Sequence, residues 1–334
     1  MRSRPDTIRE YELGDEPAIL RAFNQANAAH VSSFQARSIE QWRWRYLENP
    51  AGLRVTLAFD NEGQVLAQYA GSPQRMRLDG AWTHVTQGID SFSAVSTRGL
   101  GHRGTFVRTG ELFAEVYGAR AGAGDPYMWG FPVPIARRVG ERFLGYEALR
   151  SQVILELSAN TSLAPGESAT DFGEGPLQAS AHEFEGLFER CAEGKSVFAD
   201  RRSHVLDWRY RKRPGVHYEI GLARTIDGDL CGFAVYRTGE FEGERAGLIV
   251  DWLAEPEAEA ALARWATSHA QAAGVNRLVH LLPPTCASFI TLQELGFRVR
   301  PMQAMLVGRT YDEDYPLSFW SENWYYTLGD TDLC

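Results

Sequence analysis

The hydrophobic residues near the start of the chain follow first the period of a strand and then the period of a helix. Residues 8–13 alternate as in a strand, and the next apolar residues, spread over 18–23, recur at the spacing of one helix face. A second helix is predicted over residues 38–46, because Ser38 and Gln41 have the spacing of a capping box. The pattern therefore predicts that the chain opens in the order β-α-α.

Strand patterns follow these two helices. Two apolar runs, 55–59 and 65–69, flank a glycine turn at Gly63 and predict a hairpin. Further strands are predicted over 74–79 and 83–95. After them the pattern predicts a glycine-rich loop, a helix and a short strand, over residues 96–104, 106–116 and 127–131. The predicted order is thus β-α-α-β-β-β, then a loop, a helix and a strand.

Landmarks of the first half recur in the second half in the same order. Trp44-Arg45-Tyr46 returns as Trp208-Arg209-Tyr210, 164 residues later, and in both halves a proline stands six residues after the tryptophan. The other matched landmarks are Gly63 with Gly228, Asp90 with Asp251, 131–134 with 281–284, and 144–146 with 295–297. Because several matches keep one order, we interpret the chain as a duplicated domain rather than as a set of coincidences.

The repeat predicts a mixed α/β protein of two domains, each with a mostly antiparallel central sheet flanked by helices. We expect the first domain over residues 1–158 and the second over 177–311. Residues 159–176 are rich in Gly, Pro, Ser and Thr, as linkers are, and an aromatic tail spans 312–334.

Composition and charge narrow the class of partner. The 334 residues, 44% of them hydrophobic, are enough for about two domains with a sizeable core. The net charge of −9 disfavours a broad basic surface, so we expect no nucleic-acid partner. The four cysteines are far apart and lack zinc-ligand spacing, so we expect no metal and a reducing compartment. No signal-peptide pattern or long apolar run is present, which predicts a cytoplasmic protein with no membrane partner.

The loop after the predicted strands carries the clearest chemical signal. Glycines let a backbone approach a ligand closely, and free amides at a helix start favour a phosphate. The loop holds three glycines and three basic residues: Gly99, Gly101, Gly104, Arg98, His102 and Arg103. The alternative to a phosphate-binding loop is a tight turn between strand and helix whose arginines are solvated. The glycines also fit the dinucleotide pattern G-x-G-x-x-G, but that loop follows the first strand of a βαβ unit, whereas this one follows several strands.

The first domain resembles the GCN5-related N-acetyltransferase (GNAT) superfamily. Three segments carry the likeness: Arg103-Gly104-Thr105-Phe106, Gly130-Phe131-Pro132 and Leu144-Gly145-Tyr146. They are similar to the R-G-x-F loop, the G-F-P strand end and the L-G-[FWY] segment of one branch of that superfamily. The resemblance covers residues 5–157 well and 179–310 in outline, so the whole chain resembles a tandem-GNAT protein.

The resemblance implies an acetyl-CoA cofactor, or another acyl-CoA, whose pyrophosphate is held by the loop amides and whose pantetheine arm pairs with the strand before the loop. The residues so implied are Phe92, Ala94, Val95, Arg98, Gly101, His102, Arg103, Gly104, Thr105 and Phe106. The family's common [QR]-x-x-G-x-[GA] pattern is not matched cleanly, because His102 and Arg103 follow Gly101. The second half has the acidic segment 251–257 in place of a glycine loop, and carboxylates repel a pyrophosphate, so we expect the cofactor in the first domain only.

Three residues are candidates for acid and base chemistry. Asp90 lies in an otherwise apolar strand, where a carboxylate tends toward a raised pKa, and could accept a proton from the amine. Its match to Asp251 supports the alternative of a structural hydrogen-bond acceptor. Glu141 occupies the position of the tyrosine that protonates the thiolate in many GNAT enzymes, and Tyr127 is nearby in sequence. An exposed helix carboxylate, a core tyrosine and protonation by solvent are the corresponding alternatives.

The aromatic tail has two interpretations. So many aromatic side chains would not stay in water, so the tail is expected to pack across both domains as a clasp. Alternatively it lines the acceptor pocket, where Asp330, Asp332 or the terminal carboxylate would hold a cationic amine. The resemblance to tandem-GNAT enzymes permits the second interpretation, because some of those enzymes use their carboxyl terminus at the active site. The basic run 209–213 is interpreted as a solvated helix end rather than an RNA-binding segment.

Together these features predict an acetyl-CoA-dependent N-acyltransferase that acts on the amine of a small molecule by direct transfer in a ternary complex. Two alternatives stay open. One is a Fem-type tandem-GNAT aminoacyl transferase that uses aminoacyl-tRNA, which the net charge disfavours. The other is a non-catalytic GNAT-like binding protein.

Overall fold

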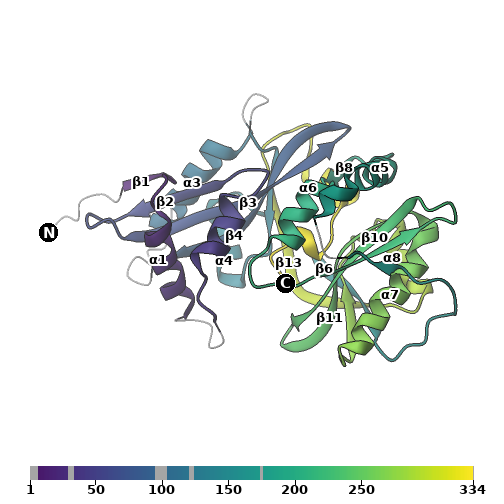
Figure 1. Ribbon diagram of the computed structural model, residues 1–334. Helices are drawn as coiled ribbons and strands as arrows, with labels where there is room; N and C mark the ends of the chain where they lie inside the picture. Colours follow the sequence, from purple (N-terminus) through teal and green to yellow (C-terminus); the bar gives the residue numbers. More distant parts are fainter. Residues whose placement is uncertain (1–6, 29–33, 95–103, 120–123, 174–175, 334) are drawn as a thin grey trace. The chain divides into compact units, whose positions relative to one another are not determined.

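The computed structural model describes residues 7–28, 34–94, 104–119, 124–173 and 176–333 (Figure 1). Contacts divide the chain into two compact units, which are called the first unit and the second unit below. The first unit comprises Met1–Arg75, Thr83–Arg150 and Ala304–Ser318. The second unit comprises Met76–Trp82, Ser151–Gln303 and Phe319–Cys334.

The first unit has the element order that the hydrophobic pattern predicts, except that the predicted runs 65–69 and 74–79 form one continuous strand. Its elements are β1 (Thr7–Glu10), α1 (Glu16–Ala28), α2 (Ile39–Tyr46), β2 (Arg54–Phe59), β3 (Val65–Leu78), β4 (Ala81–Ser93), α3 (Thr105–Tyr117), β5 (Tyr127–Gly130) and α4 (Pro134–Phe143). The strands run in the order β1-β2-β3-β4-β5-β13, with the end of β13 (Arg298–Thr310) as the last. The pairs β1–β2, β2–β3 and β5–β13 are antiparallel, and β4–β5 is parallel.

Local signals in the sequence explain where these elements begin. The Ser38 side chain accepts from the Gln41 amide, and the Gln41 side chain accepts from the Ser38 amide, so the predicted capping box is confirmed. Gly63 adopts a φ of +75°, which its turn between β2 and β3 requires. Trp42 and Tyr46 then face the core of the unit, which they share with Ile19 and strand residues of β2.

The second unit is built on a sheet of similar form. Its elements are most of β6 (Glu147–Ser158), β7 (Thr170–Asp171), α5 (Ala181–Ala192), β8 (Val197–Ala199), α6 (Ser203–Leu206), the π-helical turn η3 (Asp207–Arg211), β9 (Glu219–Arg224), β10 (Leu230–Phe241), β11 (Glu244–Ala254), α7 (Glu259–Ala272), β12 (Arg277–His280), α8 (Ala287–Glu294), part of α9 (Leu317–Asn323), β14 (Trp324–Tyr325) and η5 (Leu328–Asp330). The strands run in the order β6-β12-β11-β10-β9-β7. Here β11–β12 is the parallel pair, and the other named ladders, β6–β12, β10–β11, β9–β10 and β7–β9, are antiparallel.

The mixed α/β class with mostly antiparallel sheets is therefore confirmed. The two compact units are not contiguous halves of the sequence, because residues 304–318 belong to the first unit and residues 76–82 belong to the second. Residues 159–176, whose composition indicates a linker, fall within the second unit and contain β7. Among the described residues no helix is long and apolar enough to cross a membrane.

Candidate active site

In the first unit, the parallel pairing of β4 with β5 ends before β4 does. Strands β4 and β5 are paired from Thr86 to Gln87 on the β4 side, and β5 ends at Gly130. A Cβ atom added to Gly130 would lie 3.1 Å from the carbonyl oxygen of Gly88, so the two backbones are in close contact there. Strand β4 continues to Ser93, beyond its last described pairing with β5. Among the described residues no strand pairs with this edge of β4 after Gln87, so the edge can accept a ligand as the chain approaches the glycine-rich loop.

Backbone alternation indicates which residues of β4 face this open edge. The Ala94 amide donates a 2.8 Å hydrogen bond to the Leu66 carbonyl of β3, so it faces the neighbouring strand. Adjacent residues of a strand direct their amides to opposite edges, which leaves the backbone of Ser93 for a ligand. The predicted residue Phe92 is partly buried against the core and packs edge-on against Phe23, with ring centroids 6.0 Å apart.

Helix α3 begins just after the glycine-rich loop. Gly104 is its N-cap with extended backbone angles, a glycine has no side chain to cap the helix, and no acidic residue stands in the first turn. Gly104 and Thr105 are buried, and the Phe106 ring lies 5.7 Å from that of Tyr69. Such a helix start offers amides and the positive end of the helix dipole to an anion.

Five further residues of the predicted cofactor site lie outside the described residues. They are Val95, Arg98, Gly101, His102 and Arg103.

Asp90 lies at the centre of a polar cluster on β4. Arg37 donates two hydrogen bonds to its carboxylate, the longer of 3.0 Å, and Tyr46 donates a third of 2.7 Å. Burial would raise the pKa of Asp90, but the charges of Arg37 and Arg45 and these hydrogen bonds outweigh it and lower the pKa to about 2. Its φ of +51° marks an irregularity in the strand. These contacts favour the structural acceptor over the general base.

The second unit repeats this cluster at matching positions. Arg201 donates from Nε to Asp251 at 2.9 Å, and Tyr210 donates to the other oxygen of Asp251 at 2.8 Å. Arg201 and Tyr210 each lie 164 residues after their counterparts Arg37 and Tyr46. Neither Arg37 nor Tyr46 is among the site residues predicted from the sequence, although the repeated Trp-Arg-Tyr segment includes Tyr46.

Comparisons with solved structures place this arrangement in a known fold. A conserved protein from Enterococcus faecalis V583, described as a probable N-acyltransferase, has a TM-score of 0.66 and 14% identity, over 96% of this chain and 75% of that one. A GCN5-related N-acetyltransferase from Anabaena variabilis has a TM-score of 0.65 and 14% identity, over 92% and 73%. Saccharomyces cerevisiae N-myristoyltransferase with bound myristoyl-CoA has a TM-score of 0.55 and 11% identity, over 92% and 83%.

The chain has the GNAT fold. The recognition from the three sequence segments is thereby confirmed at the level of the fold. No protein-family model matches the sequence, and no curated protein matches it significantly.

Within this GNAT fold, the predicted proton donors have ordinary surroundings. Glu141 lies on α4 with its side chain 39% exposed and forms a 3.4 Å ion pair with Arg137 one turn earlier. Tyr127 is fully buried, and its hydroxyl lies against Gly308, where an added Cβ would be 2.1 Å away. Both positions match the alternatives of a helix carboxylate and a core tyrosine.

The part of the aromatic tail from Phe319 onward belongs to the second unit, and most of its aromatic side chains are buried. Trp320, Trp324 and Tyr326 are all at most 1% exposed. Asp330 is also buried, where Arg201 and Arg209 donate to its carboxylate, whereas Asp332 is exposed. Burial alone would raise the pKa of Asp330, but the two arginine charges hold it below its usual value. The burial and ion pairs of Asp330 within the second unit favour a structural role for this residue over binding of the acceptor amine.

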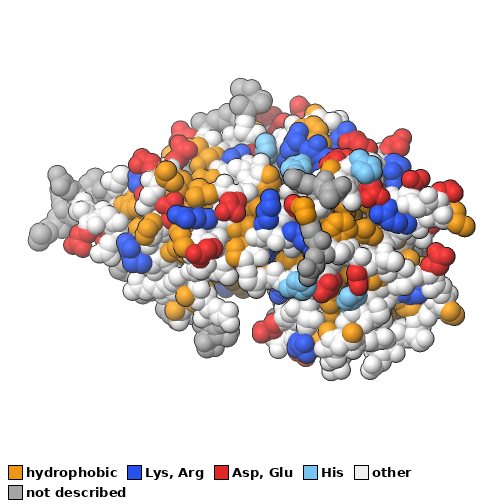
Figure 2. All heavy atoms as spheres, viewed as in Figure 1, with side chains coloured by type: hydrophobic (Ala, Val, Ile, Leu, Met, Phe, Trp, Pro, Cys, Tyr) orange, Lys and Arg blue, Asp and Glu red, His pale blue; other side chains and the backbone are white. Residues whose placement is uncertain are grey.

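Arg209 belongs to this buried cluster rather than to a solvated helix end. Its side chain is 12% exposed, and Trp208 and Tyr210 beside it are buried. The interpretation of the 209–213 run as a solvated helix end is therefore wrong for its first two residues. Figure 2 shows acidic and basic side chains interspersed on the visible face of each unit, without one extended basic field.

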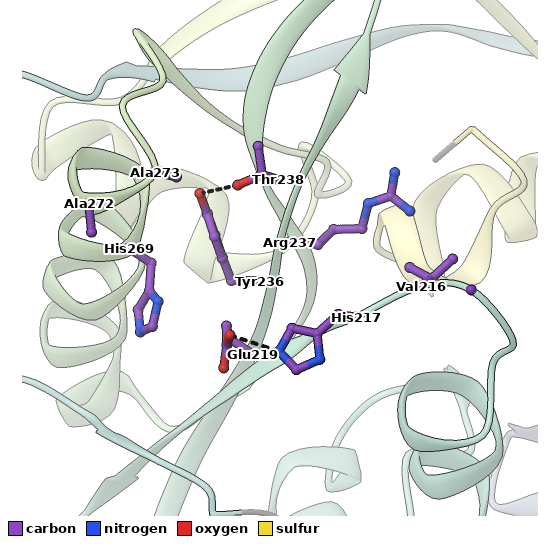
Figure 3. A pocket seen from close by; sticks show the side chains of 10 residues that line it. Val216, His217, Glu219, Tyr236, Arg237, Thr238, His269, Ala272 and Ala273 are labelled. Atoms are coloured by element: carbon purple, nitrogen blue, oxygen red, sulfur yellow. Dashed lines mark hydrogen bonds and ion pairs between the residues drawn. The ribbon is translucent and has the colours of Figure 1, made fainter.

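A cavity of about 530 Å³ lies in the second unit (Figure 3). Its lining comes from the segment before β9, from β9 and β10, and from the end of α7. His217 contacts Glu219 at 2.9 Å, and Tyr236 contacts Thr238 at 3.2 Å, so these polar groups are partly satisfied by each other. None of the predicted site residues lines it.

Proposed function

We propose that the protein is an acyl-CoA-dependent N-acyltransferase that uses acetyl-CoA and acylates the amine of a small molecule. One observation carries the proposal: among the described residues β5 does not pair with β4 beyond Gln87, and the glycine-rich loop joins the end of β4 to α3, whose N-cap is a glycine. This combination suits an elongated ligand with amide groups at one end and phosphates at the other. The GNAT fold adds support, since proteins of this fold include named N-acetyltransferases.

The described residues fit such a cofactor. The backbone of Ser93 would pair with the pantetheine arm, and the amides following Gly104 would hold phosphate oxygens. Arg98, His102 and Arg103 of the loop would add positive charge. When bound, the cofactor supplies an activated thioester carbonyl.

The chain's own residues then bind and orient the reactants for direct transfer in a ternary complex. Asp90 fixes Arg37 and Tyr46 against β4 and so maintains the irregular backbone beside the open edge. With a pKa of about 2, its carboxylate is a weak base near neutral pH. We therefore propose that Asp90 is a positioning residue, that the amine loses its proton to solvent, and that solvent protonates the departing thiolate.

Only the first unit is proposed to bind the cofactor. At the corresponding helix start of the second unit, Glu255 pairs with Arg190 at 2.8 Å, and Glu259 is buried in the first turn of α7. These carboxylates occupy the region where a phosphate would need amides and positive charge.

Calorimetric titration with acetyl-CoA tests the proposal. We expect one site per chain for the wild type and no binding for Gly104→Glu, which places bulk and negative charge at the start of α3. Gly173→Glu is the matched control, because Gly173 is exposed and an added Cβ there meets nothing within 4 Å. Circular dichroism checks that both variants fold. Absence of wild-type binding at millimolar acetyl-CoA contradicts the proposal, and transfer from aminoacyl-tRNA instead would support the Fem-type alternative.

A further inference from the structure

The polar clusters of the two units match at one further position. Arg45 and Arg209 each precede the cluster tyrosine by one residue and lie 164 residues apart. The Arg45 guanidinium carbon is 5.8 Å from the centre of the Trp44 ring, and that of Arg209 is 5.7 Å from the Trp208 ring. The two side chains therefore lie similarly on their neighbouring tryptophans.

In the second unit, a carboxylate of the chain bridges the two arginines of the cluster. Asp330 accepts from Nη2 of Arg201 and, at 3.1 Å, from Nη1 of Arg209. The Thr327 amide donates to it at 2.9 Å. With Asp251 included, two arginines face two aspartates, so the charges of this buried cluster cancel.

The first unit has the same two arginines but one aspartate fewer. Arg37 is paired with Asp90, and the charge of Arg45 acts on the same carboxylate. In the part of the chain that the structure describes, no carboxylate forms an ion pair with Arg45. The Arg37 and Asp90 side chains are 18% and 11% exposed, so this cluster is reached by solvent, whereas Arg201 and Asp251 are almost fully buried.

We propose that this position in the first unit, beside Arg45 and Arg37, binds a carboxylate of the acceptor. The acceptor is then an amine that also carries a carboxylate, such as an amino acid. The inference rests on the proposed function for its substrate, and it names the class of acceptor. In the second unit, the side-chain carboxylate of Asp330 occupies the corresponding position beside Arg201 and Arg209.

Charge balance favours a carboxylate over a phosphate. Among the described residues, the cluster of Arg37, Arg45 and Asp90 has one positive charge more than negative charges, and a single carboxylate would neutralise it. A phosphate dianion would instead leave an excess of negative charge next to Asp90. The location suits an acceptor, because Asp90 stands three residues before Ser93 on the open edge of β4.

Paired acceptors test the proposal. Initial rates of acetyl transfer are measured with an amino acid and with its amide, which keeps the amine and lacks the negative charge. We expect Arg45→Gln to lower kcat/KM for the amino acid about 10-fold to 100-fold, as loss of a charge-assisted hydrogen bond does, and to change the amide little. Arg43→Gln is the control, because Arg43 is exposed on the same helix. Equal effects of Arg45→Gln on both acceptors would overturn the proposal.

A second measurement does not depend on transfer. N-acetylglycine and N-acetylglycinamide are titrated at constant ionic strength while the side-chain Nε–H resonances of the arginines are followed by NMR. We expect the Arg45 resonance to shift and saturate with N-acetylglycine only. If it does so while no amine is acylated, the carboxylate site stands and the transferase proposal fails. If amines are acylated but neither ligand shifts Arg45, the carboxylate site is refuted.

Discussion

The hydroxyl group of Tyr46 donates a 2.7 Å hydrogen bond to the carboxylate of Asp90. The bond joins the end of α2 to the irregular part of β4, so it fixes a helix to the strand whose open edge defines the candidate site. The same bond between Tyr210 and Asp251 shows that the contact belongs to the repeated fold. A structural role for the aspartate therefore explains its presence in both units.

Removing the Tyr46 hydroxyl should destabilise the protein. Tyr46→Phe leaves the buried Asp90 with one donor fewer, and we expect a loss of about 1 to 2 kcal/mol in the free energy of unfolding. Tyr11→Phe is the control, because its 2.8 Å bond to Glu16 lies at a less buried tyrosine and should contribute less. Urea denaturation measures both variants. A stability unchanged by Tyr46→Phe would mean that the bond is not needed to hold α2 on β4.

The sequence predicts most of the elements because their signals are local. The capping box at Ser38, the turn at Gly63 and the periodicity of α3 each lie within a few consecutive residues. The polar clusters are different, since Arg37 and Asp90 are 53 residues apart and nothing local links them. The 164-residue repeat brings Arg45 and Arg209 into correspondence, but only the structure shows that Asp330 lies between the arginines of the second unit.

The distance in sequence between Asp90 and Arg37 also explains why the sequence alone allows a general-base interpretation of Asp90. Apolar neighbours along a strand predict a raised pKa for a carboxylate. The charge that reverses this shift comes from Arg37, which lies far away in the sequence. Pairing partners that decide a pKa are tertiary contacts, so local composition alone does not reveal them.

Asp330 should matter for stability, and Asp332 should not. Asp330→Ala leaves Arg201 and Arg209 buried with one aspartate for two positive charges, and we expect a loss of about 3 to 5 kcal/mol. Asp332→Ala is the matched control at an exposed position two residues later. Chemical denaturation compares the two. If Asp332→Ala instead raises the KM for the acceptor at unchanged stability, the substrate-binding role predicted for Asp332 is supported.

His280 should make stability depend on pH below neutrality. Burial lowers its pKa to about 3, and although Nδ1 contacts the Ile249 carbonyl at 2.9 Å, Nε2 has no hydrogen-bond partner among the described residues. Between pH 6.5 and 3 the unfolded chain therefore binds a proton that the folded chain excludes, and stability falls as the pH falls. Because of this group, the free energy of unfolding should fall by about 2 kcal/mol between pH 7 and pH 5.

The measurement is the free energy of unfolding at pH 7 and at pH 5. His280→Leu should remove the histidine's share of the difference, and His217→Leu, at a side chain that is 81% exposed, should leave the difference nearly unchanged. An identical pH dependence in wild type and His280→Leu would show that the unfolding transition does not exclude this proton.

A small carboxylate should restore the stability that Asp330→Ala removes. The substitution leaves a gap of carboxylate size beside Arg201 and Arg209, while the Thr327 amide that faced Asp330 stays in place. Formate can enter this gap as a separate molecule, and a ligand that binds only the folded state raises stability with the logarithm of its concentration once the site is largely occupied. We expect the melting temperature of Asp330→Ala to rise with formate and not with formamide at equal ionic strength. The wild type, whose own carboxylate fills the position, should respond to neither. Equal responses of the variant to both compounds would show that the two arginines do not select a carboxylate. The comparison with the second unit would then no longer support a carboxylate site at Arg45.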